Sequence, residues 1–440
     1  MIKKMSPELI HDYLHKYLQK AAYDIVLDLE KSNPSHIYDK KHNRYFLDMF
    51  TFFATMPLGM NHPKMFDEKF LNKLARVAIN KPSNTDFFTE ELTEFVQTFE
   101  RIALPEWGKY LFFIEGGALA VENALKIAFD WKVRKNFKKG YTEEKGHKVI
   151  YFQDAFHGRS GYTLSLTNTD PNKVQYFPKF NWIRIINPKL QFPITDEVLQ
   201  NVQSKEDLAI EQIQNAIKQF KDDIACLIIE PIQGEGGDNH FRKEFFVKLR
   251  ELCDENEILL IFDEVQTGVG LTGKMWAYEH FVEPDIIAFG KKLQIGGVIC
   301  SNRIDDVDEN VFRKGGRINS TWGGNLTDMM RGKRYLEIID EDNLIENAQV
   351  MGEYLLKSLQ DLQSEFPDVI FNARGRGLMC AIDLKDKLFR DELRKKLFEN
   401  GLIILGCGEK SIRFRPRLSI TRENINEAME IFRKSIRQIV

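Results

Sequence analysis

The sequence predicts an α/β fold, in which a mostly parallel sheet covered by helices is followed by a smaller α+β domain. From about residue 148 onward, short β-rich apolar runs alternate with helical stretches, a pattern typical of a parallel sheet. After about residue 334 the pattern changes to a long helix followed by short strands and further helices. The 440 residues allow two or three domains, and a hydrophobic content of 43% is enough for a large core.

Two helical patterns precede the alternating region. Residues 1–30 have amphipathic spacing, and Glu122–Val133 form a strong helical pattern after Gly116-Gly117. The expected strands are Lys148–Phe152, Cys226–Ile229, Ile258–Phe262 and Asp285–Phe289, and helices expected between some of them are Leu208–Phe220 and Glu244–Glu255.

The C-terminal part has its own set of expected elements: helices at Leu344–Ser364, Arg390–Asn400 and Arg422–Ile439, and strands at Leu378–Leu384 and Ser411–Pro416. We therefore expect a large domain over residues 63–333 and a small α+β domain over 334–440. Residues 1–62 have no core of their own, so we expect them to pack with the small domain.

Composition excludes several classes of function. With 62 basic and 65 acidic residues the net charge is −3, which does not indicate a nucleic-acid partner. The five cysteines form no CxxC pair, so neither a metal site nor a disulfide framework is expected. No apolar run reaches the roughly 18 residues of a membrane span, and the N-terminus lacks a secretory pattern. These features predict a cytoplasmic protein.

Charged and aromatic residues follow the expected strands. Because ligands of open α/β sheets bind beyond the carboxyl ends of the strands, these residues are the first candidates for a site. Each alone could be an ordinary loop charge, but turn chemistry favours Gly, Asn or Pro at such positions. The segments are Asp154–Arg159, Glu230–Glu235, Asp263–Gln266 and Gly290–Lys292.

This set matches the requirements of pyridoxal 5′-phosphate (PLP). A desolvated lysine with a lowered pKa can form an imine with the cofactor. A carboxylate keeps the pyridine nitrogen protonated, and an aromatic side chain can cover the ring. Backbone N–H groups at a helix start bind phosphate, and Gly116-Gly117-Ala118 precede the helical pattern at Glu122–Val133.

Three assignments stay open from the residues alone. Lys291 and Lys292 are adjacent, so composition does not distinguish them. Gly116-Gly117 could form a plain turn. His157 could be a core histidine capped by a carbonyl group instead of a ring contact.

A longer motif carries a resemblance to a known family. Phe262-Asp-Glu-Val-Gln-Thr-Gly268, Pro284-Asp285 and Gly290-Lys291 resemble the signature of class III, ornithine/GABA-type PLP aminotransferases, over nearly the whole chain. Within that family, Glu115–Ala124, Phe289–Gln294 and Asn319–Asp328 are similar to the lysine ε-aminotransferases. The resemblance implies the PLP-dependent transferase fold of type I.

The resemblance also implies roles for individual residues. Lys291, which follows the small residue Gly290, would carry PLP and shuttle the proton. Asp263 would pair with the pyridinium nitrogen, and Arg413 would be chosen from the alternating Arg413, Arg415 and Arg417. The other implied cofactor contacts are Phe156, His157 and Val265 at the ring, Gln266 at the phenolic oxygen, Glu230 near the ring, and Gly117, Ala118 and the partner subunit's Thr321 at the phosphate of a homodimer.

The implied reaction transfers the ε-amino group of L-lysine to 2-oxoglutarate, giving 2-aminoadipate 6-semialdehyde and L-glutamate. Arg159 would bind the distal carboxylate of both substrates. Arg413 would bind the α-carboxylate of glutamate, and Glu235 would neutralise Arg413 when lysine is bound, because an unpaired buried arginine is costly. GABA or ornithine as donor is the alternative within the family.

Two further expectations concern groups other than PLP. Glu115–Lys126 contain no cysteine, so the iron–sulfur cluster of animal GABA aminotransferases is not expected. Gly268–Lys274 fit both GxGxxG and GxxxxGK, which suggests a nucleotide-binding protein as the remote alternative. However, Met275 stands where a phosphate-binding loop needs Ser or Thr, and no acidic residue ends a strand about 20 residues further on.

Overall fold

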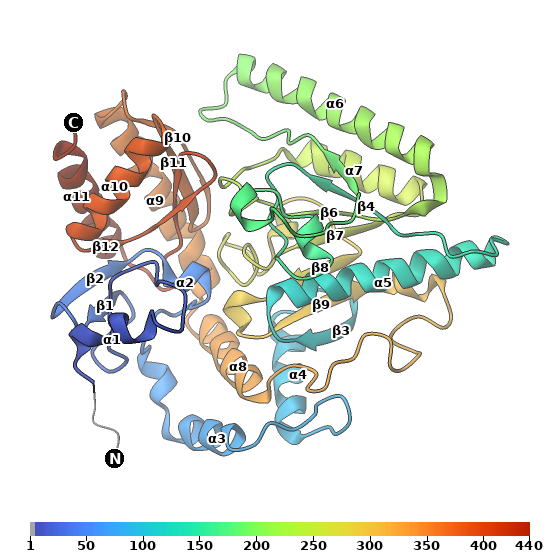
Figure 1. Cartoon of the computed structure of the whole chain (residues 1–440), viewed down its shortest axis with the longest axis horizontal. Coiled ribbons are helices and arrows are strands. Elements are labelled where there is room, and N and C mark those ends of the chain that lie inside the picture. The colour runs from blue at the N-terminus through green and yellow to red at the C-terminus, as the bar shows by residue number, and fades with distance from the viewer. Residues whose placement is uncertain (1–4) are drawn as a thin grey trace.

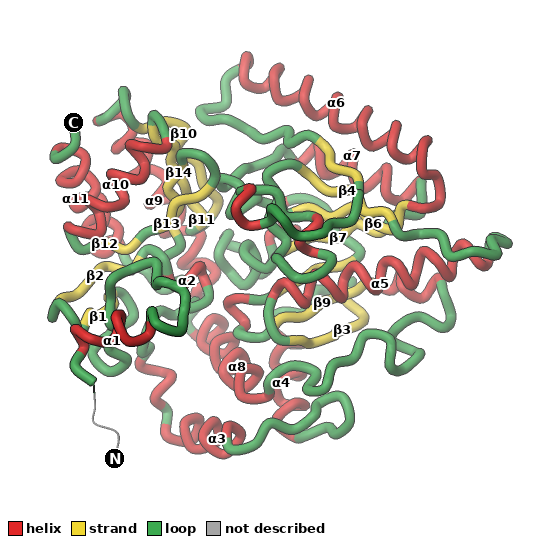
Figure 2. Tube along the Cα trace, in the orientation of Figure 1, coloured by secondary structure: helices red, strands yellow, loops and turns green. Residues whose placement is uncertain are grey.

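The computed structural model describes residues 5–440, which fold into three β-sheets with helices packed around them (Figures 1 and 2). The largest sheet has seven strands in the order β3-β9-β8-β7-β6-β4-β5, and β9 alone among them runs antiparallel to its neighbours. Its strands are β3 (Gly108–Ile114), β4 (Lys148–Phe152), β5 (Ile183–Ile185), β6 (Ile224–Ile229), β7 (Leu259–Asp263), β8 (Ile286–Phe289) and β9 (Gly296–Ser301).

Helices cover both faces of this sheet because its strands alternate buried apolar side chains between two cores. On β7, Leu259 and Ile261 pack with helix α5 (Gly117–Lys138) in one hydrophobic cluster. Leu260 and Phe262 belong to the cluster on the other face. That face is covered by α4 (Glu90–Ile102), α6 (Asp196–Phe220) and α7 (Lys243–Glu255) (Figure 1).

Two smaller sheets lie beside the large one. The four-stranded sheet β10-β11-β14-β13 is antiparallel, with helices α9 (Leu344–Glu365), α10 (Lys387–Glu399) and α11 (Arg422–Arg437) around it. Its strands are β10 (Ile370–Arg376), β11 (Met379–Leu384), β13 (Leu405–Cys407) and β14 (Ser411–Phe414). The three-stranded sheet joins the N-terminal strands β1 (His36–Asp39) and β2 (Arg44–Asp48) to β12 (Leu402–Ile403). The N-terminal segment therefore packs against C-terminal residues.

Most expected elements are present, with boundaries shifted by up to five residues, except that α6 (Asp196–Phe220) begins twelve residues before the expected helix at Leu208–Phe220. The main exception is the helix expected over residues 1–30, which was wrong for the described residues beyond Leu14: helix α1 spans only Pro7–Leu14, and residues 1–4 lie outside the described chain. No α1 residue is fully buried, so the apolar face of this helix adds nothing to the described core. Further on, Tyr23, Ile25 and Leu27 pack against a small core with a spacing of two, which is extended-chain periodicity.

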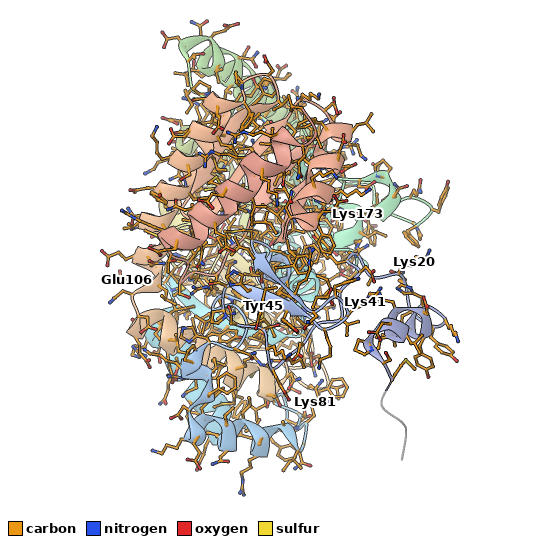
Figure 3. All side chains as sticks on the ribbon, turned by 90° about the vertical axis from the view of Figure 1, so that its left-hand side faces the viewer. Lys20, Lys41, Tyr45, Lys81, Glu106 and Lys173 are labelled. Atoms are coloured by element: carbon orange, nitrogen blue, oxygen red, sulfur yellow. The ribbon has the colours of Figure 1, made fainter. Side chains whose placement is uncertain are left out.

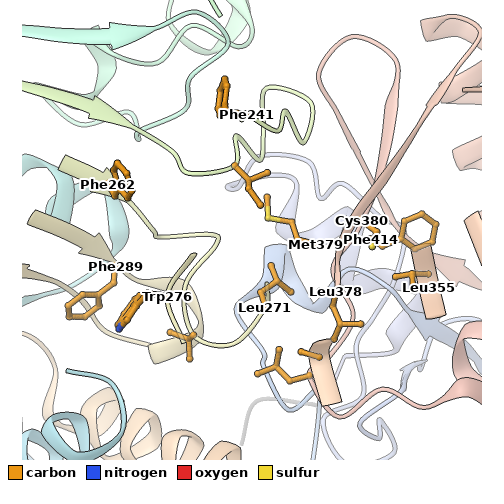
Figure 4. Packing of buried hydrophobic residues seen from close by; sticks show 14 of the residues in the cluster. Phe241, Phe262, Leu271, Trp276, Phe289, Leu355, Leu378, Met379, Cys380 and Phe414 are labelled. Carbon is orange, nitrogen blue, oxygen red and sulfur yellow. The ribbon is translucent and has the colours of Figure 1, made fainter. Parts of the chain in front are cut away.

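The boundary expected between residues 333 and 334 falls within helix α8 (Leu326–Glu341), which packs on α4, on α3 (Glu68–Ala78) and on α9. The main hydrophobic cluster also continues from the large sheet into the small domain, where Leu271 lies between Trp276 and Leu378 (Figure 4). The division at this residue stays a prediction.

Two further observations concern membrane-spanning helices and the cysteines. In residues 5–440 no helix combines the length and the apolar character needed to cross a membrane. The five cysteines are free and buried.

Candidate active site

A cavity of about 470 Å³ opens at the carboxyl ends of the parallel strands. Eleven of the thirteen residues predicted for the site line it, and Gly158 and Ser160 complete the wall. The predicted residues in the wall are Gly117, Ala118, Phe156, His157, Arg159, Glu230, Glu235, Asp263, Val265, Gln266 and Lys291. The topology thus brings together segments that are up to 174 residues apart (291 − 117).

Asp263 is the last residue of β7 and is held on both sides of its carboxylate. Oδ1 accepts a hydrogen bond from the Val265 backbone N–H at 3.0 Å, and Oδ2 lies 2.7 Å from His157 Nδ1. Among residues 5–440, Nε2 of this buried histidine has no hydrogen-bond partner. The alternative of a carbonyl-capped core histidine was therefore wrong, because His157 pairs with a carboxylate and orients it.

Glu230 follows β6 and lies close to the same pair. Its carboxylate accepts hydrogen bonds from the backbone N–H groups of Phe156 at 2.9 Å and Gly234 at 3.0 Å. Burial raises the pKa of Glu230 to about 7, against the opposing effect of His157. We call Asp263, His157, Glu230 and Lys291 the acid–lysine centre.

The two adjacent lysines have different surroundings. Both lie in the short 3₁₀ helix η6 (Lys291–Leu293) after β8, and Lys291 has a left-handed φ of 47° and faces the cavity. Burial lowers the pKa of Lys291 to about 8, although Asp263 opposes this shift. Lys292 instead points to the Gln266 backbone carbonyl, to which its Nζ donates at 2.6 Å. The geometry therefore separates the two lysines that composition left open.

The N-terminus of α5 forms another part of the cavity wall. Gly116 precedes the helix with a φ of 84°, and Gly117 and Ala118 line the cavity. A Cβ on Gly117 would lie 2.5 Å from Val265 Cγ1, so only glycine lets the helix start approach the β7 loop this closely. The unpaired N–H groups of a first helical turn make such a wall suitable for an anionic group.

A second cluster, which we call the gate, consists of Glu235, Arg413 and Lys173. Arg413 on β14 is buried, and its Nη2 donates to Glu235 Oε2 at 2.5 Å. Lys173 bonds to the other oxygen, Oε1. Burial alone would raise the pKa of Glu235, but Arg413 and Lys173 together hold it below its usual value. Glu235 is therefore a carboxylate with two cationic partners.

A buried ion pair lies next to the gate. Arg415 and Asp238 are both fully buried, and Arg415 Nη1 donates to Asp238 Oδ2 at 2.9 Å. Arg415 Nη2 and Nε also donate to Gln266 Oε1 at 2.8 Å and 3.0 Å. The side-chain oxygen of Gln266 is thus turned toward Arg415, which orients the amide.

Strand alternation would place Arg413, Arg415 and Arg417 on one face, but the structure does not continue the strand that far. Strand β14 ends at Phe414, and Arg415 N bonds to the Met49 carbonyl, outside the small sheet. Beyond this point the alternation of a regular strand no longer applies. Arg417 bonds instead to Ser35, at 2.9 Å from Nη2 to Oγ.

Two predicted residues stand apart from these clusters. Arg159 is exposed and lines the cavity. Thr321 is exposed and lies outside the cavity wall of its own chain. Its loop is anchored by the Asn84 backbone N–H, which donates to the Trp322 carbonyl at 3.0 Å. Exposed Phe87 and Phe88 follow in the same anchoring segment.

Sequence reasoning missed Lys173, Asp238 and the contact of Arg415 with Gln266. Lys173 follows no expected strand, and Asp238 lies just beyond the Glu230–Glu235 segment. Only the position of Asp238 near a strand end could have drawn attention to it.

The residues present fit PLP. The cavity contains a carboxylate held by His157 and a backbone N–H, a lysine with a lowered pKa, the aromatic residue Phe156 and a helix start of small residues. In the described chain, groups of three or more His, Cys, Asp or Glu side chains arranged to hold a metal ion are absent.

Comparisons with known proteins agree with this geometry. The family model Aminotransferase class-III matches residues 17–436. The L-lysine-epsilon aminotransferase of Mycobacterium tuberculosis is 48% identical over 98% of this chain and 96% of its own length, and that of Streptomyces clavuligerus is 45% identical over 97% and 94%. The human mitochondrial 4-aminobutyrate aminotransferase is 31% identical over 93% of this chain. A solved structure of lysine aminotransferase from M. tuberculosis in the internal aldimine form superposes with a TM-score of 0.97, at 47% identity, covering 99% of this chain and 100% of that chain.

Proposed function

The chain belongs to the class III aminotransferases, and we propose that it is a PLP-dependent L-lysine 6-transaminase. It transfers the ε-amino group of L-lysine to 2-oxoglutarate, which gives 2-aminoadipate 6-semialdehyde and L-glutamate. The single observation that carries this proposal is the paired state of Arg413. With Arg413 neutralised by Glu235, the exposed Arg159 is the arginine that remains for a substrate carboxylate among the described residues of the cavity wall.

That arrangement suits lysine. The reacting carbon of lysine is its terminal methylene, which has no neighbouring carboxylate. A single arginine can bind the distant carboxylate by two parallel hydrogen bonds, and the neutralised Arg413 leaves no unpaired charge beside the reacting amine. Glutamate has a second carboxylate beside its reacting carbon, so it needs Arg413 released from Glu235.

PLP, when bound, supplies an electron-accepting ring that stabilises negative charge on the substrate carbon that loses its proton. Asp263, oriented by His157, would hold the proton on the ring nitrogen. Lys291 would hold the cofactor covalently through Nζ and then carry the proton to and from the substrate carbon. Its pKa of about 8 leaves part of the amine neutral near neutral pH, which both tasks require.

The remaining cofactor contacts follow from the cavity wall. Gly117 and Ala118 at the start of α5 would bind the phosphate, while Phe156 and Val265 would enclose the ring. Gln266 presents its amide nitrogen as a donor for the phenolic oxygen, because Arg415 occupies its side-chain oxygen. Glu230, with a pKa raised to about 7, lies behind the ring contacts.

We further propose that the enzyme is a homodimer and that the partner subunit's Thr321 completes the phosphate site. Exposed apolar side chains surround the Thr321 loop: Phe87 is 73% exposed, Phe88 86% and Trp322 43%. Large apolar side chains gathered on one surface indicate an interface. Analytical ultracentrifugation should show a dimer, and Thr321→Ala should weaken PLP retention. A monomer that keeps full activity would contradict this part of the proposal.

The donor is tested by single-turnover half-reactions with lysine, ornithine and GABA, followed through the absorption change of the cofactor. Lysine should react fastest. Clearly faster amine transfer from ornithine or GABA would overturn the lysine assignment while leaving the aminotransferase class in place. A purified protein that takes up no PLP would overturn both.

A further inference from the structure

Glu235 has two cationic partners, and they differ in exposure and in the element that carries them. Arg413 extends from strand β14 and its side chain is 2% exposed, whereas the Lys173 side chain is 27% exposed. Lys173 ends the short 3₁₀ helix η3 (Pro171–Lys173), which lies in the loop between β4 and β5. Figure 3 shows Lys173 on a loop that projects from the body of the molecule. Glu235 thus joins a buried arginine on a strand to a more exposed lysine on a loop.

Glu235 also stands between two cavities. It lines the cavity of the acid–lysine centre and a second cavity of about 610 Å³, whose wall includes Lys173. Lys173 Nζ lies 5.6 Å from the centre of the Phe156 ring, which belongs to the inner cavity. The Lys173–Glu235 pair therefore forms part of the partition between the inner and the outer cavity.

Releasing Arg413 has an energetic consequence for Glu235. A substrate carboxylate that binds Arg413 must displace the Glu235 carboxylate, which would then be a largely buried charge. An unpaired buried charge is strongly unfavourable, whereas a carboxylate that keeps one charge-assisted hydrogen bond is much less so. Because Lys173 and Arg413 occupy different oxygens of Glu235, the bond to Lys173 can persist when the bond to Arg413 breaks.

We propose that Lys173 is a positioning residue that holds Glu235 while Arg413 binds the α-carboxylate of glutamate or 2-oxoglutarate. Lys173 lowers the energetic cost of the open gate and so sets the balance between the two half-reactions. This inference rests on the proposed function, since it requires a substrate pair that uses Arg413 in only one half-reaction.

Substitutions of Lys173 and of Glu235 should impair opposite half-reactions. Removing Glu235 abolishes the closed gate and therefore impairs the lysine half-reaction. Removing the Lys173 charge leaves the Glu235–Arg413 pair intact but makes its opening more costly, so the glutamate half-reaction is impaired. A residue that merely stabilised the fold would weaken both half-reactions together.

The experiment uses PLP-loaded enzyme and the variants Lys173→Met, Lys173→Arg, Glu235→Gln and the Lys173→Met/Glu235→Gln double variant. Lys189→Met is the matched control, because Lys189 lines the same outer cavity but pairs with Asp154 at 3.2 Å. Two quantities are measured: the equilibrium affinity for glutarate, a five-carbon dicarboxylate without a reactive amine or keto group, and the rates of the lysine and glutamate half-reactions.

In Lys173→Met we expect glutarate affinity and the glutamate half-reaction to fall about tenfold, the effect of one lost charge-assisted hydrogen bond. The lysine half-reaction should be unchanged. Lys173→Arg should restore glutarate affinity and the rate of the glutamate half-reaction. Lys189→Met should behave as the native enzyme. In the Glu235→Gln background, Lys173→Met should have no further effect on glutarate affinity.

Three results would contradict the inference or its premise, and they are distinguishable. If Glu235→Gln lowers both half-reactions equally, the gate itself fails, and with it the premise. If Glu235→Gln changes the balance but Lys173→Met resembles Lys189→Met, only the role of Lys173 fails. If Lys173→Met weakens both half-reactions and does so equally in the Glu235→Gln background, Lys173 acts on the fold and not through Glu235.

Discussion

The acid–lysine centre lines the inner cavity and the gate lies at its border with the outer one, yet the two clusters are built in different ways. Asp263 ends strand β7 of the seven-stranded sheet, and Glu230 and Lys291 follow strands β6 and β8 of the same sheet. The gate joins Glu235 and Lys173 of the large sheet's loops to Arg413 of the small sheet. The first cluster is built at the strand ends of one sheet, whereas the second is assembled across two sheets.

This difference corresponds to two chemical requirements. Proton transfer needs groups that keep their geometry, and the carboxylate of Asp263 is held by Val265 N–H and His157. Accepting both a monocarboxylate amine and a dicarboxylate needs groups that exchange partners, and Glu235 has two cations to choose from. Under the proposed function, the strand ends would carry the chemistry, and the contact between the sheets would carry the substrate discrimination.

The largest effect should come from Lys291. Lys291→Ala removes both the covalent attachment of PLP and the proton carrier, so we expect turnover to fall about 10⁴-fold, the upper end of what positioned proton transfer contributes. Borohydride reduction of the native enzyme followed by peptide mapping should place the label on Lys291. A label on Lys292 would show that the fixed centre has been assigned to the wrong residue.

Asp263 comes next. Asp263→Asn keeps the shape but removes the charge beside the ring nitrogen, so we expect kcat/KM to fall about 10²–10⁴-fold in both half-reactions. His157→Gln should also lower kcat/KM in both half-reactions, but by a smaller factor, because His157 acts through Asp263. If His157→Gln is the more damaging of the two in steady-state assays, the histidine has a direct role and the order of the pair is reversed.

For the gate, Glu235→Ala should lower the lysine half-reaction about tenfold or more while affecting the glutamate half-reaction less, because an unneutralised Arg413 is unfavourable only for lysine. Single-turnover rates with each substrate provide the measurement. Equal losses of rate in the lysine and glutamate half-reactions would contradict a separate role of the gate.

The smallest effect concerns pH. Burial lowers the pKa of Lys291 from 10.5 to about 8, so the reactive neutral amine of the apoenzyme increases as pH rises toward 8 and is nearly complete above it. PLP uptake by apoenzyme should therefore rise about tenfold per pH unit below 8 and then level off. A free lysine amine of ordinary pKa serves as control and should continue to rise. The same continued rise in the enzyme would contradict burial of Lys291.

Sequence reasoning reached the strand-end residues because a parallel sheet brings the carboxyl ends of its strands to one edge, so Asp263, Glu230 and Lys291 could be expected to meet. It failed beyond Leu14 in the segment expected to be helical up to residue 30, where Tyr23, Ile25 and Leu27 pack with the spacing of an extended chain. It also grouped Arg413, Arg415 and Arg417, because the end of β14 at Phe414 is not visible in the alternation.

By itself, the sequence determined the α/β fold class and the strand-end segments that contain the acid–lysine centre, since both follow from local periodicity and from the rules of parallel sheets. The roles of single residues within those segments came from the resemblance to class III aminotransferases. The tertiary structure alone decided which lysine faces the cavity, that His157 bonds to Asp263, and that Lys173 and Arg413 share Glu235. These are contacts between side chains distant in sequence. Their partners depend on how loops and sheets pack in space, and local patterns do not encode that packing.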